Sequence, residues 1–375
     1  MKLTRSSRHL KMATVLVTGA IVLTACGSDN NSTSPSDDGS TAAAAPSGDA
    51  ACFNGTLNAE GSSAQQNAID EVIASYTSTC ADATINYNPT GSGAGVEQFN
   101  GGQVDFAGSD SALKDDEGEV AAASERCGGN DAWNIPMVVG PIAMAYNLPG
   151  VDTLVLTPEV ASNLFKGKIK KWDDPAIKAL NKDAKLPGSA IKVFFRSDES
   201  GTTENFQKYL AGAGGGAWTD EPSKVWPGAG EGREKSSGVS DGVKTTEGSI
   251  TYVEWSYAKD NDLGIAQVDN GAGPVELTGE AVGKAIASAK SVGTGNDLRL
   301  ELDYATKTAG AYPIDLVTYE IVCSKGLPAD KAEAVKKFLT FFSSAETQTS
   351  LEEIGYAPLP AEVQTKVATA VEALS

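Results

Sequence analysis

The segment Phe194-Phe195-Arg196-Ser197-Asp198-Glu199-Ser200-Gly201-Thr202-Thr203 joins two different patterns in this sequence. Residues 191–195 (Ile-Lys-Val-Phe-Phe) have the composition of a strand and lead directly into Arg196. After Gly201, apolar residues recur at helical spacing, namely Phe206, Tyr209 and Leu210. We therefore expect a strand that ends at Arg196 and a helix that opens at residues 200–202.

This junction has the composition of an oxyanion-binding site. The first N–H groups of a helix have no partner within the helix, and the helix dipole places a partial positive charge there. Ser200 and Thr202 add hydroxyl groups, and Gly201 allows a ligand to approach closely. Arg196 adds a guanidinium group that can bind an oxyanion through two hydrogen bonds. The alternative interpretation is an ordinary Ser/Thr N-cap beside a surface arginine.

Two further segments have the same order of strand, Gly/Ser turn and helix. Gly61-Ser62-Ser63 follows the run 55–59 and precedes apolar residues at helical spacing, namely Ile69, Val72, Ile73 and Tyr76. Residues 90–95 (Thr-Gly-Ser-Gly-Ala-Gly) follow the run 84–87 and precede the helical pattern at 96–99. Each turn alone is a weak signal, because Gly/Ser loops are common. With the Arg196 segment, they indicate that several helix N-termini converge on one anion.

The ordered set of motifs resembles the periplasmic-type phosphate-binding protein of the phosphate ABC importer. The resemblance covers nearly all of the chain from about Gly55 to Pro360. The specific motifs are Gly167-Lys168-Ile169-Lys170-Lys171-Trp172-Asp173-Asp174 and Arg196-Ser197-Asp198-Glu199-Ser200-Gly201-Thr202. The supporting motifs are Gly61-Ser62-Ser63, Gly91-Ser92-Gly93-Ala94-Gly95-Val96, Asp105-Phe106-Ala107-Gly108-Ser109-Asp110 and Tyr252-Val253-Glu254.

The resemblance implies a two-lobed α/β fold of the type II periplasmic binding proteins. Each lobe is expected to contain a mixed, mainly parallel sheet flanked by helices, with the ligand in a cleft between the lobes. Lobe 1 would comprise residues 52–147 and 311–375, and lobe 2 residues 148–310. The long apolar runs at 135–148 and 314–322 are expected to cross between the lobes. Independently, the alternation of strands and helices from Thr56 to Phe106 indicates an α/β unit, and the chain of 375 residues suggests two domains.

The N-terminal residues have the features of an export signal. Four basic residues precede the apolar run 12–23, which is shorter than a typical membrane-spanning helix. Leu23-Thr24-Ala25-Cys26 resembles a bacterial lipobox, so residues 1–25 are expected to be a signal peptide that is cut before Cys26, which then carries the lipid. The alternative is that Cys26 merely lies near an ordinary cleavage site. Residues 26–51 are expected to form a disordered tether with a reach of roughly 25–30 Å.

Charge and histidine content exclude several functional classes. Without residues 1–25, the chain has 26 basic and 49 acidic side chains and a net charge of −23, which excludes generic nucleic-acid binding. An anion site is still compatible with this charge, because surface charges are screened within about 8–10 Å. His9, the only histidine, lies in the signal, so Ser-His-Asp catalysis and histidine metal sites are excluded from the mature protein. We expect no catalytic residue, no metal and no cofactor.

The mature chain contains four cysteines after Cys26, which is an even number and favours two disulfides in an exported protein. Three pairings are conceivable. Cys52 precedes the first expected strand and Cys80 ends the first expected helix, and these two points lie at the same end of a strand-helix-strand unit. We therefore favour Cys52–Cys80, which leaves Cys127–Cys323.

The sequence also predicts the local structure of several other segments. The acidic stretch 114–125 is interpreted as a solvated helix start rather than a cation site, and the basic residues 166–171 as a loop that packs Trp172 rather than as a phosphate site. The glycine-rich stretch 212–235 is expected to be irregular. The remaining expected elements are strands at 103–110 and 250–253 and helices at 157–165, 175–180 and 332–342.

By position, the resemblance implies a set of phosphate ligands, namely Ser62, Ser63, Ser92, Asp110, Arg196, Ser200, Gly201 and Thr202. Asp198 matches the carboxylate that orients the arginine. The sequence departs from the family pattern at Ser63, where some members have phenylalanine, and at Glu199, where glycine is frequent. A backbone contact would survive the first change, whereas the second adds negative charge near the mouth of the site.

Asp110 is the residue expected to distinguish phosphate from sulfate. Phosphate near neutral pH always carries a proton, and an ionised carboxylate only accepts hydrogen bonds. Fully ionised sulfate would leave two anionic oxygens facing each other, and sites that demand such a proton can discriminate by about 10⁴–10⁵. The alternative role for Asp110 is to cap a turn at the end of a strand.

The predicted function is capture of inorganic phosphate rather than chemistry. The anion binds one lobe, closure brings the donors of the other lobe onto it, and the closed form docks on a membrane permease served by a cytoplasmic ATPase. The protein would be exported and lipid-anchored on the extracytoplasmic face of the cell membrane. Competing interpretations are a binder of sulfate or molybdate, a secreted phosphatase or serine hydrolase that uses Ser200 or Ser92, and a structural surface antigen.

Overall fold

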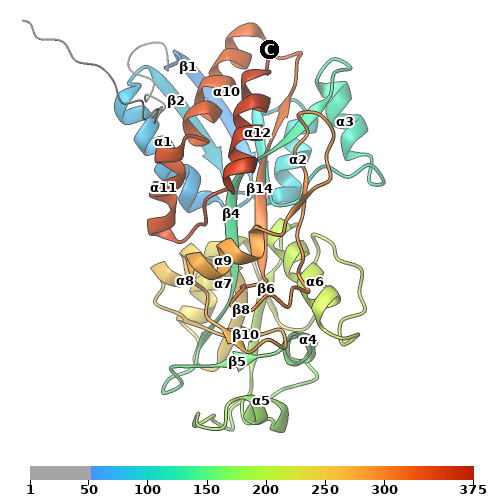
Figure 1. Ribbon diagram of the computed structural model, residues 1–375, viewed down its shortest axis with the longest axis vertical. Coiled ribbons are helices and arrows are strands. Elements are labelled where there is room, and N and C mark those ends of the chain that lie inside the picture. The colour runs from blue at the N-terminus through green and yellow to red at the C-terminus, as the bar shows by residue number, and fades with distance from the viewer. Residues whose placement is uncertain (1–51) are drawn as a thin grey trace, which may run out of the picture. The chain divides into compact units, whose positions relative to one another are not determined.

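Two long strands occupy the middle of the main sheet. The computed structural model describes residues 52–375, which belong to one contact-defined unit. Strands β4 (Ala132–Asn147) and β14 (Asp315–Cys323) lie side by side and antiparallel (Figure 1). Both are buried along almost their whole length, which explains why their sequences are continuous apolar runs rather than alternating ones.

The main sheet in the described part of the chain has nine strands in the order β2-β1-β3-β14-β4-β8-β6-β7, and β9 also pairs with β4. Parallel pairs join β1 to β2 and β3, and β6 to β7 and β8. Each antiparallel pair of this sheet includes β4 or β14, so the sheet is mixed, as predicted. The bounds of its other strands are β1 Gly55–Gly61, β2 Ala83–Asn88, β3 Phe106–Ser109, β6 Lys192–Arg196, β7 Glu231–Arg233, β8 Ser249–Glu254 and β9 Gly264–Ile265.

Strand β4 changes partner along its length. Residues 132–141 pair with β14, and residues 142–147 pair with β8. The fold is therefore a two-lobed α/β fold, with β1, β2 and β3 in the first lobe, β6, β7 and β8 in the second, and β4 passing between them. The lobe bounds at 147/148 and 310/311 stay a prediction.

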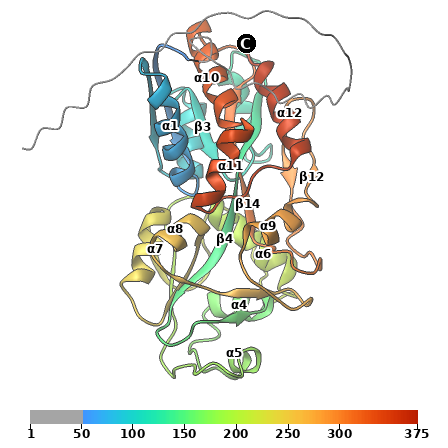
Figure 2. The ribbon, with the colours of Figure 1, turned by 60° about the vertical axis from the view of Figure 1, so that its left-hand side comes forward.

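In the first lobe, the order of strands places helices on both faces of the sheet. The chain passes from β1 through α1 (Gln66–Thr79) to β2, and then back through α2 (Ser92–Asn100) to β3 on the other side of β1. Because parallel crossovers are right-handed, these two opposite steps place α1 and α2 on opposite faces. Helices α10 (Ala329–Phe342) and α11 (Ala345–Ile354) pack against α1, as Figure 2 shows.

The second lobe repeats this arrangement. The step from β6 to β7 passes through α6 (Gly201–Ala213), and the opposite step from β7 to β8 passes through α7 (Lys235–Lys244), so α6 and α7 lie on opposite faces. The prediction that residues 212–235 are irregular is wrong at residues 231–233, because these residues form β7, which pairs in parallel with β6. In both lobes, the helix N-termini lie at the carboxyl ends of parallel strands, where ligands bind in such sheets.

The other elements complete the two lobes. Their bounds are α3 Glu119–Arg126, α4 Pro158–Phe165, α5 Pro175–Leu180, α8 Trp255–Asp260, α9 Gly279–Ile286, α12 Ala361–Glu372, β5 Val155–Leu156, β10 Gln267–Asp269, β11 Pro274–Val275, β12 Lys290–Ser291 and β13 Leu300–Glu301. No helix within residues 52–375 is both long enough and apolar enough to span a bilayer. The predicted signal peptide, Cys26 and the tether lie outside the described residues.

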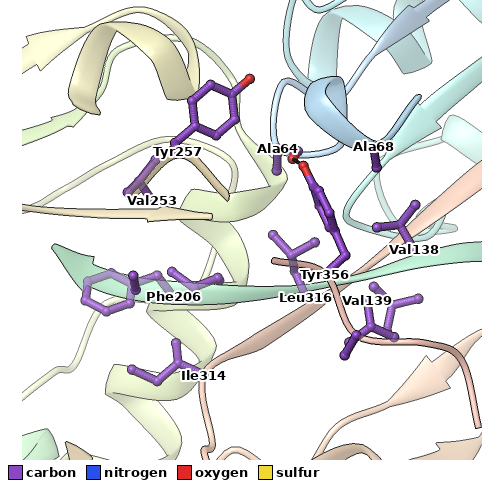
Figure 3. Close-up of a cluster of buried hydrophobic side chains, with 14 of the residues drawn as sticks. Ala64, Ala68, Val138, Val139, Phe206, Val253, Tyr257, Ile314, Leu316 and Tyr356 are labelled. Carbon is purple, nitrogen blue, oxygen red and sulfur yellow. Dashed lines mark hydrogen bonds between the residues drawn. The ribbon is translucent and has the colours of Figure 1, made fainter. Parts of the chain in front are cut away.

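A buried apolar cluster surrounds the point where β4 changes partner. Figure 3 shows Leu316 and Ile314 of the β14 region beside β4, with Tyr257 and Tyr356 reaching toward the turn after β1. The hydroxyl of Tyr356 donates to the carbonyl of Ala64 at 2.7 Å, and that of Tyr257 donates to the carbonyl of Ser63 at 2.8 Å. The apolar junction thus fixes the backbone on which the first Gly/Ser turn is built.

Two disulfides connect the pairs that the sequence favours. Cys52 and Cys80 tie the segment before β1 to the end of α1, across 28 residues of chain. Cys127 and Cys323 tie the end of α3 to the end of β14, across 196 residues. The second bond joins a helix of the first lobe to the strand that returns late in the chain.

Candidate anion-binding site

Hydroxyl groups from four separate elements surround the carboxylate of Asp110, which follows β3. Ser62 and Thr318 donate to its Oδ1 at 2.6 and 2.8 Å. Ser92 and Thr202 lie at 3.3 and 3.4 Å from its Oδ2. These residues come from the turn after β1, the start of α2, the first turn of α6 and the middle of β14. The carboxylate is therefore a meeting point of both lobes, and its side chain is buried.

Glycines allow these elements to approach so closely. A Cβ on Gly201 would lie 2.6 Å from the Cβ of Asp110 and 2.7 Å from the Oγ of Ser92. A Cβ on Gly95 would lie 2.5 Å from the Cα of Gly61, which itself has a φ of +145°. Gly95 is thus required by contact with the backbone of Gly61, and Gly201 by contact with Asp110 and Ser92, and these positions bring the N-termini of α2 and α6 together.

Arg196, at the end of β6, supplies the buried cation of the site. Its Nε donates to Oδ1 of Asp198 at 2.7 Å, and its Nη2 donates to Oδ2 of the same carboxylate. The backbone N–H of Lys235 also donates to Asp198, at 3.0 Å. Asp198 therefore orients the guanidinium through a two-point contact and is itself held by the start of α7.

Ser236 is a site residue that sequence reasoning missed. Its Oγ lies 3.1 Å from the Oγ of Ser63, and Nη1 of Arg196 donates to it at 3.3 Å. Its backbone N–H donates to the Oγ of Ser63 at 3.0 Å. Ser63, which departs from the family pattern, thus connects the turn after β1 to the first turn of α7. The only sequence signal was the pair Ser236-Ser237 after a short polar run, which does not stand out from an ordinary loop.

Thr318 was also missed, and Tyr252 was noted only as part of a supporting motif and not as a site residue. Thr318 lies inside an apolar strand, where a buried polar residue is the informative exception. The hydroxyl of Tyr252 lies 2.7 Å from the Oγ1 of Thr203 and accepts a hydrogen bond from the backbone N–H of Arg196 at 3.2 Å. Tyr252 therefore links the end of β6 to the first turn of α6.

The predicted ligand Ser200 and the residue Glu199, which departs from the family pattern, have other contacts. The Oγ of Ser200 accepts from the backbone N–H of Thr203 at 3.2 Å, so this side chain caps α6 and is not one of those around Asp110. Glu199 is exposed, and its backbone carbonyl accepts from the N–H of Gly93 at 3.1 Å. Its side chain covers Gly93, because a Cβ at that glycine would lie 2.4 Å from Oε2 of Glu199. The expected negative charge is thus beside the start of α2.

The charges of the site depend on burial and on the ion pair. Burial raises the pKa of Asp110 above its ordinary value, and hydrogen bonds from Ser62 and Thr318 act in the opposite direction. Burial alone would raise the pKa of Asp198, but its hydrogen bonds with Arg196 bring it below the ordinary value. Burial alone would lower the pKa of Arg196, and the contact with Asp198 raises it instead. The site therefore contains one permanent cation paired with one carboxylate, next to a second carboxylate in a hydroxyl-rich environment.

A cavity of about 440 Å³ lies against Asp110 on the side of α6 and β13. Three basic side chains line it, Lys114, Lys208 and Arg299. Glu204 lies between the two lysines, with its carboxylate 3.2 Å from Nζ of Lys114 and 2.8 Å from Nζ of Lys208. Glu301 also lines the cavity, and Arg299 is paired with Asp297 at 2.8 Å, so the basic side chains nearest to the buried carboxylate are balanced by acidic ones. Within residues 52–375, no cluster of His, Cys, Asp and Glu has the arrangement of a metal site.

Comparison with known proteins gives consistent matches along the chain. A family model described as a PBP superfamily domain matches residues 35–346. The phosphate-binding protein PstS3 of Mycobacterium bovis (strain BCG / Pasteur 1173P2) is 46% identical over 366 residues, which are 96% of this chain and 97% of the relative. The phosphate-binding protein PstS 2 of Mycobacterium tuberculosis (strain ATCC 25618 / H37Rv) is 44% identical over 381 aligned residues, which cover 100% of both chains.

Solved structures share the fold at lower identity. A high-affinity periplasmic phosphate-binding protein (PfluDING) bound with phosphate has a TM-score of 0.68 and 21% identity, covering 84% of this chain and 93% of the other. A phosphate-binding protein from Stenotrophomonas maltophilia has a TM-score of 0.64 and 18% identity, with the same coverage of 84% and 93%. These likenesses extend over both lobes and establish the two-lobed architecture.

Proposed function

The chain belongs to the PBP superfamily and, within it, to the PstS phosphate-binding proteins. On this premise, we propose that it captures inorganic phosphate at the site around Asp110 and Arg196 and delivers it to an ABC permease. The family predicted from the sequence motifs is confirmed by these relatives. These relatives are named as phosphate-binding proteins, which supports a role in binding and transport; that the chain catalyses no reaction is part of the proposal.

The observation that carries the proposal is the convergence of helix N-termini on a buried arginine and a buried carboxylate. The starts of α2 and α6 meet at Asp110, and the start of α7 meets Arg196 through Ser236. Each helix start supplies N–H groups without an intrahelical acceptor and a partial positive charge. These donors supply the positive potential that the Arg196–Asp198 pair, being neutral overall, does not.

The proposed ligand set consists of Ser62, Ser63, Ser92, Asp110, Arg196, Ser200, Gly201 and Thr202. Ser200 would act through its backbone, because its hydroxyl already caps α6. Gly201 and Thr202 would donate N–H groups from the first turn of α6, and Arg196 would bind a phosphate oxygen while Asp198 holds its orientation. Asp110 would accept a hydrogen bond from the protonated oxygen of phosphate, which gives the site its preference over sulfate.

Delivery requires that the two lobes separate and close again. Contacts between segments of the two lobes include Asn205, whose Nδ2 donates to the carbonyl of Asp110 at 2.7 Å, and Lys224, whose Nζ lies 2.6 Å from Oε1 of Glu119. Such contacts would form on closure around the anion and break on release. We further propose that the protein is exported, anchored by a lipid on Cys26 to the extracytoplasmic face of the membrane, and docks in its closed form on permease subunits that a cytoplasmic ATPase serves.

Calorimetric titration tests the proposal. The protein starting after Cys26, which lacks the signal and the lipid-bearing cysteine, is freed of bound phosphate and titrated with phosphate and then sulfate at pH 7.5. Micromolar or tighter phosphate binding with no sulfate heat supports the assignment. Equal binding of both anions would favour a general oxyanion binder, and no heat from either would contradict the proposal. A phosphate-ester assay on the same sample covers the hydrolase alternative.

A further inference from the structure

A second buried carboxylate, Glu320, lies near the phosphate site and has no role in the ligand set. Its side chain is completely buried in β14, and neither Oε1 nor Oε2 has a hydrogen-bond partner. An ionised carboxylate in such surroundings is strongly disfavoured unless it is paired. Either a neighbouring donor or a change of protonation state must therefore account for this side chain.

The strand register places Glu320 beside a hydrogen-bonded chain that leads to the site. In β14, Thr318 and Glu320 lie two residues apart and face the same side of the sheet, and Thr318 donates to Asp110. The partner of Glu320 on β3 is Gly108. A Cβ on Gly108 would lie 1.9 Å from Nε2 of Gln65 and 2.6 Å from Oη of Tyr87. The space next to Glu320 is thus occupied by the Gln65 amide and the Tyr87 hydroxyl.

The direction of this chain is fixed at its far end. The carbonyl of Ser62 can only accept, and the Tyr87 hydroxyl donates to it at 2.7 Å. The Tyr87 oxygen must then accept, and Nε2 of Gln65 donates to it at 3.0 Å. This orientation leaves Oε1 of Gln65 as a buried acceptor without a partner. A donor is required at that position, and Glu320, whose carboxyl group contacts the Gln65 amide, would provide one when it is protonated.

We propose that Glu320 is held as a neutral carboxylic acid that donates to Oε1 of Gln65, and that it is a positioning residue for the phosphate site. The inference rests on the proposed function. One proton on Glu320 would give Oε1 of Gln65 a hydrogen-bond donor and would also remove the negative charge of Glu320. Through Gln65 and Tyr87, Glu320 acts on the backbone of Ser62, whose hydroxyl donates to Asp110 at 2.6 Å.

The neutral state also limits negative charge near the anion. Burial raises the pKa of Glu320 to about 8, the Gln65 amide acts in the opposite direction, and the Asp110 carboxylate raises the pKa further. The titratable groups that face Glu320 are Asp110, which follows β3, and Tyr87 on β2. Among residues 52–375, no lysine or arginine is paired with it. A phosphate bound beside Asp110 adds negative charge and raises the pKa of Glu320 again, so binding above pH 8 takes up a proton from water.

The test compares the wild-type protein with Glu320→Gln, whose amide imitates the protonated acid in shape and as a donor. Phosphate affinity is measured by calorimetry at pH 7.0, 8.0, 9.0 and 9.5, in buffers of different ionisation enthalpy, so that proton uptake is counted. Infrared spectra of both proteins at pH 7 record the carbonyl band of protonated carboxyl groups. The matched control is Glu352→Gln, an exposed glutamate of α11 that does not line the cavity beside Asp110.

We expect Glu320→Gln to bind phosphate normally at pH 7 and to lack one protonated-carboxyl band. Between pH 7 and 9.5, the wild-type affinity should fall roughly tenfold more than that of Glu320→Gln, with extra proton uptake in the wild type only. Identical pH profiles and identical infrared bands would overturn the inference. If the variant does not fold, spectra of Glu254→Gln, which removes the other glutamate whose pKa burial raises to about 8, must still show a carbonyl band that decreases as pH passes 8, and a constant band overturns the inference. Absence of phosphate binding by the wild type at pH 7 would instead contradict the proposed function, and the infrared comparison would still decide the protonation of Glu320.

Discussion

The Cα of Gly201 lies so close to Asp110 that an added Cβ would be 2.6 Å from the aspartate Cβ. Gly201 is the first residue of α6, and Asp110 follows β3, so this contact joins the two lobes directly. Only a residue without a side chain permits the start of α6 to reach the carboxylate. The glycine is therefore a requirement of the closed site rather than of helix geometry.

The first prediction is that Gly201→Ala weakens phosphate binding by roughly tenfold or more, because the methyl group holds the start of α6 away from Asp110. Calorimetry at pH 7.5 measures the affinity. Gly212→Ala is the matched control, since this glycine lies in the same helix and a Cβ there would meet nothing within 4 Å. Equal affinities of the two variants would show that α6 does not approach the anion.

The second prediction concerns anion choice. Asp110→Asn should weaken phosphate binding by roughly 10- to 100-fold and should allow measurable sulfate binding, because an amide can donate to an oxyanion where the carboxylate can only accept. Thr318→Val, which removes one donor to Asp110 without changing its charge, is the control and should keep the rejection of sulfate. Sulfate rejection that survives Asp110→Asn would assign selectivity to another residue.

The sequence predicted the parts of this site that lie in local motifs. Ser62, Ser92 and Thr202 each stand in a Gly/Ser turn between a strand and a helix, and the structure brings all three to Asp110. Ser236 and Thr318 could not be predicted in this way. Ser236 reaches Arg196 because β7 places the start of α7 beside β6, and β7 is a three-residue strand whose composition gives no strand signal. Thr318 meets Asp110 through the pairing of β14 with β3, which joins segments about 200 residues apart.

The third prediction concerns the two disulfides. By the loop-entropy model, a crosslink across 196 residues stabilises by roughly 5 kcal/mol, and one across 28 residues by roughly 3.5 kcal/mol. Replacement of Cys127 and Cys323 by alanine should therefore lower the free energy of unfolding more than the same replacement of Cys52 and Cys80. Urea unfolding followed by circular dichroism measures both. If replacing Cys52 and Cys80 lowers the free energy of unfolding more, loop entropy does not account for the stabilisation by these two disulfides.

The fourth prediction concerns the pH dependence of stability. Burial raises the pKa of Glu254 to about 8 from an ordinary value of 4.5, although hydrogen bonds from Ser256 oppose this. Below pH 4.5 both the folded and the unfolded states hold the proton, so this group does not oppose folding. As pH rises from 4.5 to 8, the unfolded state loses the proton that the folded state retains, and stability decreases.

Glu254→Gln should remove this loss and should make the protein more stable than the wild type at pH 9 by about 2–4 kcal/mol. Urea unfolding at pH 5, 7 and 9 measures the difference between the two proteins. Glu280→Gln is the control, because this glutamate is exposed and its pKa is lowered by Lys284. If the stability difference between Glu254→Gln and the wild type is constant across this pH range, the assignment of a neutral Glu254 is wrong.

The last prediction tests the residue that the sequence did not reveal. Ser236→Ala removes the hydroxyl that accepts from Nη1 of Arg196 at 3.3 Å and that lies 3.1 Å from the Oγ of Ser63. Arg196 keeps its two-point contact with Asp198, so the cation stays in the site but its third nitrogen loses a fixed partner. We expect phosphate affinity to fall by roughly threefold to tenfold while the thermal midpoint changes little.

The control is Ser240→Ala, which lies about one turn later in the same helix, is equally buried and donates to the carbonyl of Ser237 at 3.0 Å. It removes a buried hydroxyl from α7 without touching Arg196, so it should leave phosphate affinity unchanged. A loss of affinity in both variants would mean that α7 contributes through its stability alone. A loss confined to Ser236→Ala would instead establish that the start of α7 takes part in holding the anion. Ser63 would then contribute to the anion-binding groups of the second lobe as well as the first, through its contact with Ser236.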